Sequence, residues 1–407
     1  MSTFFQGHSP QSLVKKYGSP LYVYNEGIFR EKCQNMMNLC TYPNFRVNYA
    51  IKANTNLTLM AIAREEGLRA DVSSAGEIVA ALAAGFLPKD ILFIANNISK
   101  DEMKFAIDMG ITISVDSLSQ LETYGRINFG GKIAVRFNTG IVGGHHEKVI
   151  TGGDNTKFGM LADYMLDVKN LLNKYNLRLV GINHHIGSQY AQELYINGAK
   201  VLLDIAREFD DLDFIDFGGG FCIPYHKQQG EKAFDLKPIG QELSEHMQDF
   251  STRYGKELMC IIEPGRYICA ESGVLLGTVH AVKQVGTTKY AGTDMGFSVF
   301  ARPTLYESHH DIEIYRHGGV GDAKEVINIV GNQCESGDYI AKERFVPVIK
   351  EGDVLGVMDA GAYGYSMSSQ YNHRPRPAEI LIRKDGSLKL IRRRDSYEDM
   401  LLNMQGL

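Results

Sequence analysis

The stretch VNYAIKANTN (residues 47–56) joins an apolar run to a lysine and then to small polar residues. The run from Val47 to Ile51 is typical of a buried strand, because β-branched and aromatic side chains favour strands. Lys52 stands where that strand would end. Lysine is among the residues least often buried, and an ammonium group at a strand end can simply extend into solvent. Whether Lys52 has a chemical role therefore depends on what the rest of the chain brings to it.

Seven further β-rich runs follow this one, with helical patterns between them. Most of the runs are continuously apolar, which is typical of parallel strands that are covered on both faces. Amphipathic stretches such as SAGEIVAALAAG separate them, and Gly85 at the end of that stretch is a common helix stop. The eight runs are residues 45–54, 68–74, 91–96, 111–117, 132–138, 178–187, 214–220 and 257–266. Eight strand–helix units in about 220 residues predict an α/β fold with a (β/α)8, TIM-like barrel at residues 26–270.

After residue 270 the alternation of strand-like and helical patterns gives way to strand-like runs alone. GVLLGTVHAVKQVG, DVLGVMDAGAYG and PAEILIRKDGSLKLI combine strand-like runs with glycine-containing turns, and KDGS carries the signal of a hairpin. The leading SPLYVYN (residues 19–25) is also strand-like and can join either part. We therefore expect a mostly β, barrel-like C-terminal domain that is built from residues 1–25 and 271–407 and completes the active site.

The composition argues against several classes of function. The chain of 407 residues is 44% apolar and 22% charged, which is typical of a soluble globular protein, and its net charge of −5 offers no electrostatic case for nucleic acid or an anionic membrane. The sequence begins without an apolar signal region, and no stretch approaches the roughly 20 apolar residues of a membrane span. Six cysteines at irregular spacings argue against a structural zinc site or a disulfide framework, and favour a reduced, cytoplasmic setting.

Polar residues and glycines follow six of the eight expected strands. Barrel enzymes place their chemistry at the carboxyl ends of the strands, so these residues would share one rim. They are Lys52, then Asp71 and Ser73, then Arg136 and Asn138, then His184, His185 and Ser188, then Gly218, Gly219 and Gly220, and finally Glu263, Gly265 and Arg266. A single histidine at a strand end is more often structural than catalytic. The alignment of the whole set, however, favours a chemical role for Lys52.

The contents of this rim suggest a cofactor. The run DFGGGF leaves backbone N–H groups uncovered, and the loops after the seventh and eighth strands are the usual phosphate site of this fold. A triple glycine alone is weak, because tight turns use it too. The rim also holds a lysine for a Schiff base, a ring to stack (His185) and an acid to pair with a pyridine nitrogen (Glu263). Together these groups describe a site for pyridoxal 5'-phosphate.

The sequence resembles the fold-type III pyridoxal phosphate decarboxylases, and most closely the diaminopimelate decarboxylases. The resemblance runs nearly end to end, through YGSPLYVYN, YAIKAN, DVSSAGE, HIGSQ, DFGGGF, EPGR, RPTLY, CESGD and GAYGYSMSSQYNHRPRPAEIL, of which the last two are the most specific. It implies decarboxylation of meso-2,6-diaminopimelate to L-lysine, the last step of lysine biosynthesis. It also implies a homodimer whose active sites are shared across the interface.

The resemblance implies roles for individual residues. Lys52 would form the Schiff base, His185 would stack on the ring, and Glu263 would pair with the ring nitrogen. Cys334 as proton donor and Glu335 as partner of the distal ammonium would come from the other subunit. The other cofactor-binding positions are Asp71, Arg136, Ser188, Gly218, Gly219, Gly220, Gly265, Arg266 and Tyr363. The other substrate-binding positions are Arg266, Arg302, Tyr306 and Tyr363.

Structural alternatives exist for three of these residues. Cys334 can be a buried apolar side chain, as free cysteines often are. Arg302 and Tyr306 can form a surface ion pair or a packing contact, and their i, i+4 spacing is not decisive because Pro303 lies between them.

Departures from the family pattern leave the exact substrate open. Phe297 and Ser298 stand where the family has Met-Asn, Asn183 begins the tripeptide that is HxH in the family, and Gly331-Asn332 replaces Gly-Pro. One alternative is a decarboxylase of a related basic or acyl-linked amino acid, of the ornithine, lysine or arginine type. Such substrates lack a distal carboxylate, which leaves Arg302 unexplained. Two others are a racemase, which needs a second base in place of CESGD, and a catalytically silent relative, which the presence of Lys52 disfavours.

Overall fold

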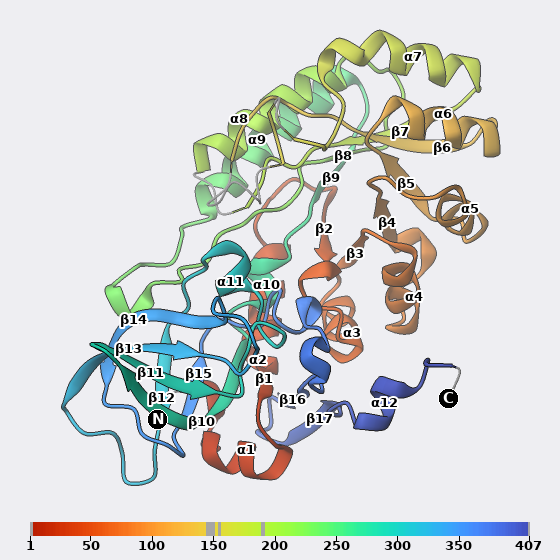
Figure 1. Ribbon diagram of the computed structural model, residues 1–407. Coiled ribbons are helices and arrows are strands. Elements are labelled where there is room, and N and C mark those ends of the chain that lie inside the picture. The colour runs from red at the N-terminus through yellow and green to blue at the C-terminus, as the bar shows by residue number, and fades with distance from the viewer. Residues whose placement is uncertain (1–2, 144–150, 154–155, 189–191, 406–407) are drawn as a thin grey trace. The chain divides into compact units, whose positions relative to one another are not determined.

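The structure is a computed structural model that describes residues 3–143, 151–153, 156–188 and 192–405. The chain divides into two compact units (Figure 1). The barrel unit comprises Arg30–Ile223 and Phe234–Ile268, and the β-rich unit comprises Met1–Phe29, Pro224–Ala233 and Cys269–Leu407. Residues 224–233, which the sequence prediction included in the barrel domain, thus group with the β-rich unit. Within the described ranges, no helix is long and apolar enough to cross a membrane.

The barrel unit is a closed parallel barrel, as predicted. In the described part of the chain its strands are β2 (Phe45–Ala50), β3 (Arg69–Val72), β4 (Ile91–Ile94), β5 (Thr112–Val115), β6 (Lys132–Arg136), β7 (Arg178–Asn183), β8 (Phe214–Asp216) and β9 (Met259–Ile262). Each strand pairs with the next along the chain, and β2 pairs with β9 to close the cylinder, with Val47 opposite Ile262. All eight observed strands begin within or at the start of the predicted runs. The runs start at most two residues before the strands and extend further beyond them at their carboxyl ends, where the polar rim begins.

Helices alternate with these strands along the chain (Figure 1). They are α3 (Leu57–Glu65), α4 (Ala75–Ala83), α5 (Lys100–Asp108), α6 (Leu118–Ile127), α7 (Met165–Lys174), α8 (Gln192–Ala206) and α9 (Lys237–Tyr254), with α2 (Glu26–Met37) before the first strand and the short α10 (Arg266–Cys269) after the last. Side chains that satisfy free backbone N–H groups start several of them, including Ser74 at α4 and a capping box of Ser99 and Glu102 at α5. Gly85, with φ of +91°, follows the end of α4, where an L side chain would be strained.

Apolar side chains fill the barrel interior. Leu92, Ile94, Ala134, Val180, Phe214 and Ile261 form one buried cluster. Because the barrel is filled rather than open, chemistry is confined to its two ends. The carboxyl ends of the strands carry the predicted site, and the amino ends carry a separate hollow that is described below.

The β-rich unit contains one mixed sheet. Its main path runs β14 (Tyr339–Pro347), β13 (Lys324–Val330), β11 (Thr288–Thr293), β10 (Gly273–Val285), β1 (Leu21–Asn25), β16 (Ala378–Ile382), β17 (Leu388–Arg392), and β12 (Ile312–Tyr315) and β15 (Val354–Val357) branch from it. The predicted hairpin is β16–β17, whose strands pair antiparallel. The strand-like stretch 19–25 is β1, which lies between β10 and β16 in this sheet. The prediction of a mostly β second part is therefore confirmed.

Short helices and an apolar core complete this unit. The helices are α1 (Pro10–Tyr17), α11 (Arg302–Tyr306) and α12 (Tyr397–Leu401). Leu21, Val23, Leu276 and Ile380 belong to a buried cluster that joins β1 to its neighbours. The inserted segment 224–233 is held by Lys227, whose Nζ lies 2.8 Å from Asp359 Oδ1 and 2.8 Å from Glu271 Oε1.

Candidate active site

Lys52 lies directly after β2, on the single turn Ile51–Ala53. Its Nζ donates to Asp71 Oδ2 at 3.0 Å, and Asp71 comes from β3, the neighbouring strand, opposite Ala50 in register. The Lys52 side chain is 43% exposed, whereas Asp71 is fully buried. A fully buried carboxylate therefore holds the amine at the carboxyl end of the barrel, where the sequence predicted it. This geometry differs from that of an unrestrained surface lysine, because the partner carboxylate is desolvated.

Two further buried acids lie at the same end. Asp216 ends β8, Glu263 follows β9, and the two buried carboxyl groups interact. Burial raises the pKa of both acids. Asp216 and Asp71 raise the pKa of Glu263 further, whereas the interaction with Glu263 lowers that of Asp216. Arg136, at the end of β6, is 7% exposed, and burial lowers its pKa although Glu263, Asp116, Asp71 and Asp216 oppose that shift.

His185 is held as a neutral ring. The backbone N–H of Gly219 donates to His185 Nδ1 at 3.1 Å, so the ring proton belongs on Nε2. Burial lowers the pKa of His185 well below its ordinary value, and the positive charges of Arg136 and Lys52 lower it further. A neutral, oriented imidazole is suited to stacking against a flat ligand. It is not a source of positive charge at this rim.

The glycine run after β8 is required by crowding and backbone geometry. Gly218 has φ of +66°, and a Cβ there would lie 2.4 Å from the carbonyl oxygen of His184. A Cβ on Gly219 would lie 2.0 Å from the carbonyl oxygen of Glu263. Two of the N–H groups are used internally, because Gly218 donates to Asp216 Oδ1 at 2.9 Å and Gly219 to His185. Within the described residues the N–H of Gly220 makes no hydrogen bond, so this group is the one left to a ligand.

Arg266 and Ser188 meet beside this loop. Arg266 begins α10 immediately after Gly265 and is 7% exposed. Its Nε and Nη2 lie 3.3 Å and 3.1 Å from Ser188 Oγ. The start of α10 thus adds a guanidinium and a hydroxyl to the glycine loop, and the combination is suited to an anionic group such as a phosphate.

The barrel residues fit pyridoxal phosphate. Among the described residues, Glu263 Oε1 and Asp71 Oδ1 are buried and have no hydrogen-bond partner. Such oxygens are costly unless a ligand satisfies them. A buried acid oxygen without a partner suits a ring nitrogen, and the glycine loop, which carries no side chains, suits a phosphate together with Arg266. The lysine, the ring and the acid of the sequence prediction are therefore brought together on one rim.

The remaining predicted residues lie in the β-rich unit. Arg302 and Tyr306 are the first and last residues of α11, and Pro303 is tolerated because it lies in the first turn. Arg302 is 1% exposed, so it is not the surface side chain of the structural alternative. Its Nη1 donates to Tyr225 Oη at 2.7 Å and its Nη2 to Ser308 Oγ at 3.2 Å, and its Cζ lies 5.0 Å from the centre of the Tyr225 ring. Tyr363 has φ of +56°.

Cys334 and Glu335 lie on an exposed turn of the same unit. The Cys334 Sγ is 3.5 Å from Glu335 Oε1, its backbone N–H donates to Asn372 Oδ1 at 3.1 Å, and Tyr371 Oη donates to Glu335. Cys334 is exposed, so it is not the buried filler of the structural alternative. The departures Phe297 and Ser298 support this turn: Gln333 donates to Ser298 Oγ, and the Phe297 ring lies 5.4 Å from that of Tyr371.

Two residues of this chemistry were not among the sequence predictions. Asp216 stands directly before the glycine run, in FIDFGGG, and its place at a strand end was a usable signal. Tyr225 lies in segment 224–233, and no local pattern marks it as the partner of Arg302. Only the tertiary structure of the β-rich unit reveals that contact.

Comparison with known proteins points in one direction. The family model "Pyridoxal-dependent decarboxylase, pyridoxal binding domain" matches residues 26–270. The diaminopimelate decarboxylase of Methanothermobacter thermautotrophicus is 41% identical, over 97% of this chain and 94% of the relative. A crystal structure of a diaminopimelate decarboxylase is similar with a TM-score of 0.90, 33% identity and 99% of both chains covered. That of Helicobacter pylori diaminopimelate decarboxylase complexed with L-lysine has a TM-score of 0.88 and 30% identity, and covers 96% of this chain and 98% of that one.

Proposed function

Because the chain belongs to the pyridoxal-dependent decarboxylases, and among them to the diaminopimelate decarboxylases, we propose that it removes CO2 from meso-diaminopimelate to give L-lysine. The observation that carries this proposal is the ammonium of Lys52, held 3.0 Å from the buried Asp71 on the rim that also bears the buried Glu263. Bound pyridoxal phosphate supplies a ring that accepts the electrons left behind when CO2 departs.

The barrel residues would hold and tune that cofactor. Lys52 supplies the amine that attaches it, and Asp71 fixes the position of this amine. Glu263 pairs with the ring nitrogen through Oε1, and His185 stacks on the ring as a neutral imidazole. Gly220, Arg266 and Ser188 bind the phosphate, while Gly218, Gly219 and Gly265 keep the loop free of side chains. Arg136 offsets the negative charge of the surrounding acids, among them Asp216 and Glu263, whose pKa values burial raises.

The β-rich unit would bind the substrate and complete the site. Arg302 binds the carboxylate that is retained in the product, because a guanidinium fork matches a carboxylate plane. Its burial makes such a pair strong, since charge-assisted hydrogen bonds gain strength where water is excluded. Tyr306 and Tyr363 would contribute neighbouring hydroxyl groups, and Tyr363 would also contact the phosphate. The division at residues 26–270 stays our prediction for the boundaries of the cofactor-binding domain.

The active site would be shared in a homodimer. Cys334 and Glu335 lie on a turn that is exposed in the single chain, and a thiol that returns a proton must meet the reacting carbon of a site that excludes water. We assign Cys334 to the neighbouring subunit's site as its proton donor, and Glu335 to the distal ammonium of the substrate. The described cysteines form no disulfides, which supports a cytoplasmic setting.

The experiment that tests this function compares substrates side by side. Release of CO2 by the pyridoxal phosphate-loaded protein is measured on meso-diaminopimelate, L-lysine, L-ornithine and L-arginine at equal concentrations. We expect turnover of diaminopimelate alone, because only this substrate retains a second carboxylate for Arg302. Faster turnover of lysine or ornithine would move the protein to the alternative class.

A further inference from the structure

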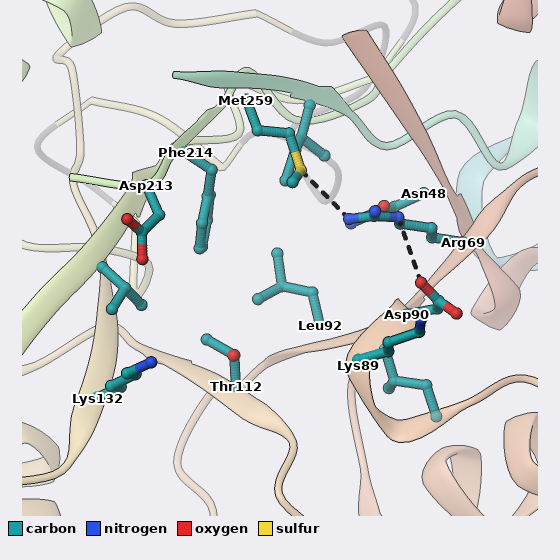
Figure 2. A pocket seen from close by; sticks show the side chains of 13 residues that line it. Asn48, Arg69, Lys89, Asp90, Leu92, Thr112, Lys132, Asp213, Phe214 and Met259 are labelled. Atoms are coloured by element: carbon teal, nitrogen blue, oxygen red, sulfur yellow. Dashed lines mark hydrogen bonds and ion pairs between the residues drawn. The ribbon is translucent and has the colours of Figure 1, made fainter. Parts of the chain in front are cut away.

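A hollow of about 210 Å³ opens at the amino ends of the barrel strands, the end opposite Lys52 (Figure 2). Arg69, Thr112, Lys132 and Met259 are the first residues of β3, β5, β6 and β9 and line it. All of its lining residues belong to the barrel unit. The proposed chemistry uses none of them.

Arg69 is poorly paired for a guanidinium. Its Nη1 donates to the thioether Sδ of Met259 at 3.2 Å, and its Nε lies 3.5 Å from Asp90 Oδ1 (Figure 2). A thioether is a weak acceptor, and five N–H donors of a guanidinium need more than one distant carboxylate. Burial lowers the pKa of Arg69, which indicates that its charge is only partly compensated.

The charges around the hollow are unequal. Lys132 and Lys89 are exposed and form no ion pair within the described ranges of the chain. Asp213, the second acid at this hollow, is already bound by Arg178 Nη2 at 2.7 Å and Lys256 Nζ at 2.9 Å. Arg69, Lys89 and Lys132 therefore place three positive charges at the hollow. Among the described residues that line it, Asp90 is the one acid that no residue outside the hollow neutralises.

Asn48 adds a buried polar group that lacks a partner. It lies in β2 opposite Arg69 in register, is 2% exposed and lines the hollow. Its Oδ1 has no hydrogen-bond partner among the described residues. A buried acceptor that is left unsatisfied is costly, so Asn48 Oδ1 at the edge of this hollow points to a bound group that donates a hydrogen bond.

From these observations we propose that the amino-terminal mouth of the barrel binds a small anion that carries a carboxylate or a phosphate. The guanidinium fork of Arg69 grips two of its oxygens, and Lys132 and Lys89 neutralise its charge. A hydroxyl group of the ligand, such as the one that a protonated phosphate carries, would donate to Asn48 Oδ1. This site is separate from the cofactor's phosphate loop, which lies at the carboxyl ends of the same strands.

Isothermal titration of the pyridoxal phosphate-loaded protein tests the proposal, because the cofactor then occupies its own phosphate loop. The probes are inorganic phosphate and succinate, each compared with potassium chloride at equal ionic strength. We expect saturable binding of one anion per chain, and the tighter of the two probes identifies the chemical class. Arg69→Gln should weaken this binding at least about tenfold, the loss expected for a charge-assisted hydrogen bond.

Matched variants separate a site from a general charge effect. Lys132→Gln should weaken binding severalfold, whereas Lys169→Gln, which removes an exposed cation paired with Glu208 outside the hollow, should leave it unchanged. Arg69→Lys keeps the charge without the fork and should bind more weakly than wild type. Should Arg69→Gln fail to fold, the exposed Lys132 decides. The proposal would be overturned if Arg69→Lys and Lys132→Gln both bound the probes as tightly as wild type, or if chloride gave the same heat as the probes.

Discussion

Removing one hydroxyl group, in Tyr225→Phe, tests the proposed role of Arg302 without changing any charge. In the structure the Tyr225 oxygen accepts from Arg302 Nη1 at 2.7 Å, and both side chains are buried. Phenylalanine keeps the ring beside the guanidinium and loses the hydroxyl group that accepts this hydrogen bond. The variant therefore loosens the guanidinium that we assign to the substrate's retained carboxylate.

The expected loss follows from that single contact. A hydrogen bond to a charged group contributes about 1.5–3 kcal/mol, which corresponds to roughly 10- to 150-fold in kcat/KM. Because Arg302 grips a carboxylate that does not react, the contact is equally strong in the ground and transition states, and the loss should appear in KM rather than in kcat. Initial rates of CO2 release over a range of meso-diaminopimelate concentrations separate the two.

Two controls make this test specific. Tyr254→Phe removes a hydroxyl that donates to the backbone of Phe209 at 2.5 Å in the barrel unit, and should leave KM unchanged. Inhibition by L-lysine, which keeps the gripped carboxylate, should weaken in parallel with KM, whereas inhibition by 1,5-diaminopentane, which lacks it, should not. A Tyr225→Phe enzyme with wild-type KM, or one that loses both inhibitors alike, would refute the reasoning.

The remaining predictions concern the cofactor, the shared site and acid stability. Lys52→Ala should lose the visible absorption band of the attached cofactor and nearly all turnover, with an unchanged far-ultraviolet circular dichroism spectrum; a retained band would contradict the assignment. An equal mixture of Lys52→Ala and Cys334→Ala chains should recover about a quarter of wild-type activity, since half of randomly paired dimers hold one intact site; no recovery after demonstrated subunit exchange would exclude a shared site. Burial lowers the pKa of His184 to about 3. In the unfolded chain this histidine takes up a proton below about pH 6.5, whereas in the folded chain it stays neutral down to about pH 3. The free energy of unfolding should therefore fall as the pH drops from about 6.5 towards 3, and His184 contributes about 1.4 kcal/mol per pH unit to this fall. His184→Asn should flatten that slope in urea unfolding, and an unchanged slope would count against the buried neutral ring.

The barrel was predictable because its strands are short apolar runs that stand between helical patterns. The run expected at 91–96 is β4, Ile91–Ile94, and the run at 132–138 is β6, Lys132–Arg136. Each prediction extends past the real strand by two residues, because the first rim residues continue the strand-like composition. The same overshoot occurs at Lys52, which the chain places on a separate turn. The local sequence pattern therefore predicts the first residue of a strand more accurately than its last hydrogen-bonded residue.

The candidate site was predictable in part. Lys52, His185 and Glu263 could be found because they follow strands that must meet at one rim. Asp216 was missed as an acid of that rim, and Tyr225 could not be found. Tyr225 contacts Arg302 only because segment 224–233 belongs to the β-rich unit, although the residues on either side of it in the sequence belong to the barrel unit. That grouping depends on contacts between residues distant in sequence, such as Lys227 with Asp359.

The position of β1 in its sheet has a consequence for biosynthesis. Leu21 of β1 pairs with Leu276 of β10 on one edge and with Ala378 of β16 on the other. When the ribosome has synthesised the whole barrel unit, which ends at Ile268, neither β10 nor β16 has been made yet. The barrel can therefore fold on the nascent chain while β1, an apolar strand on its amino-terminal side, still has both edges unpaired. A chain that stops before Ala378 would leave one of those edges permanently unpaired, and such an edge is available to other chains. Premature termination before β16 should therefore yield aggregates rather than a shortened enzyme.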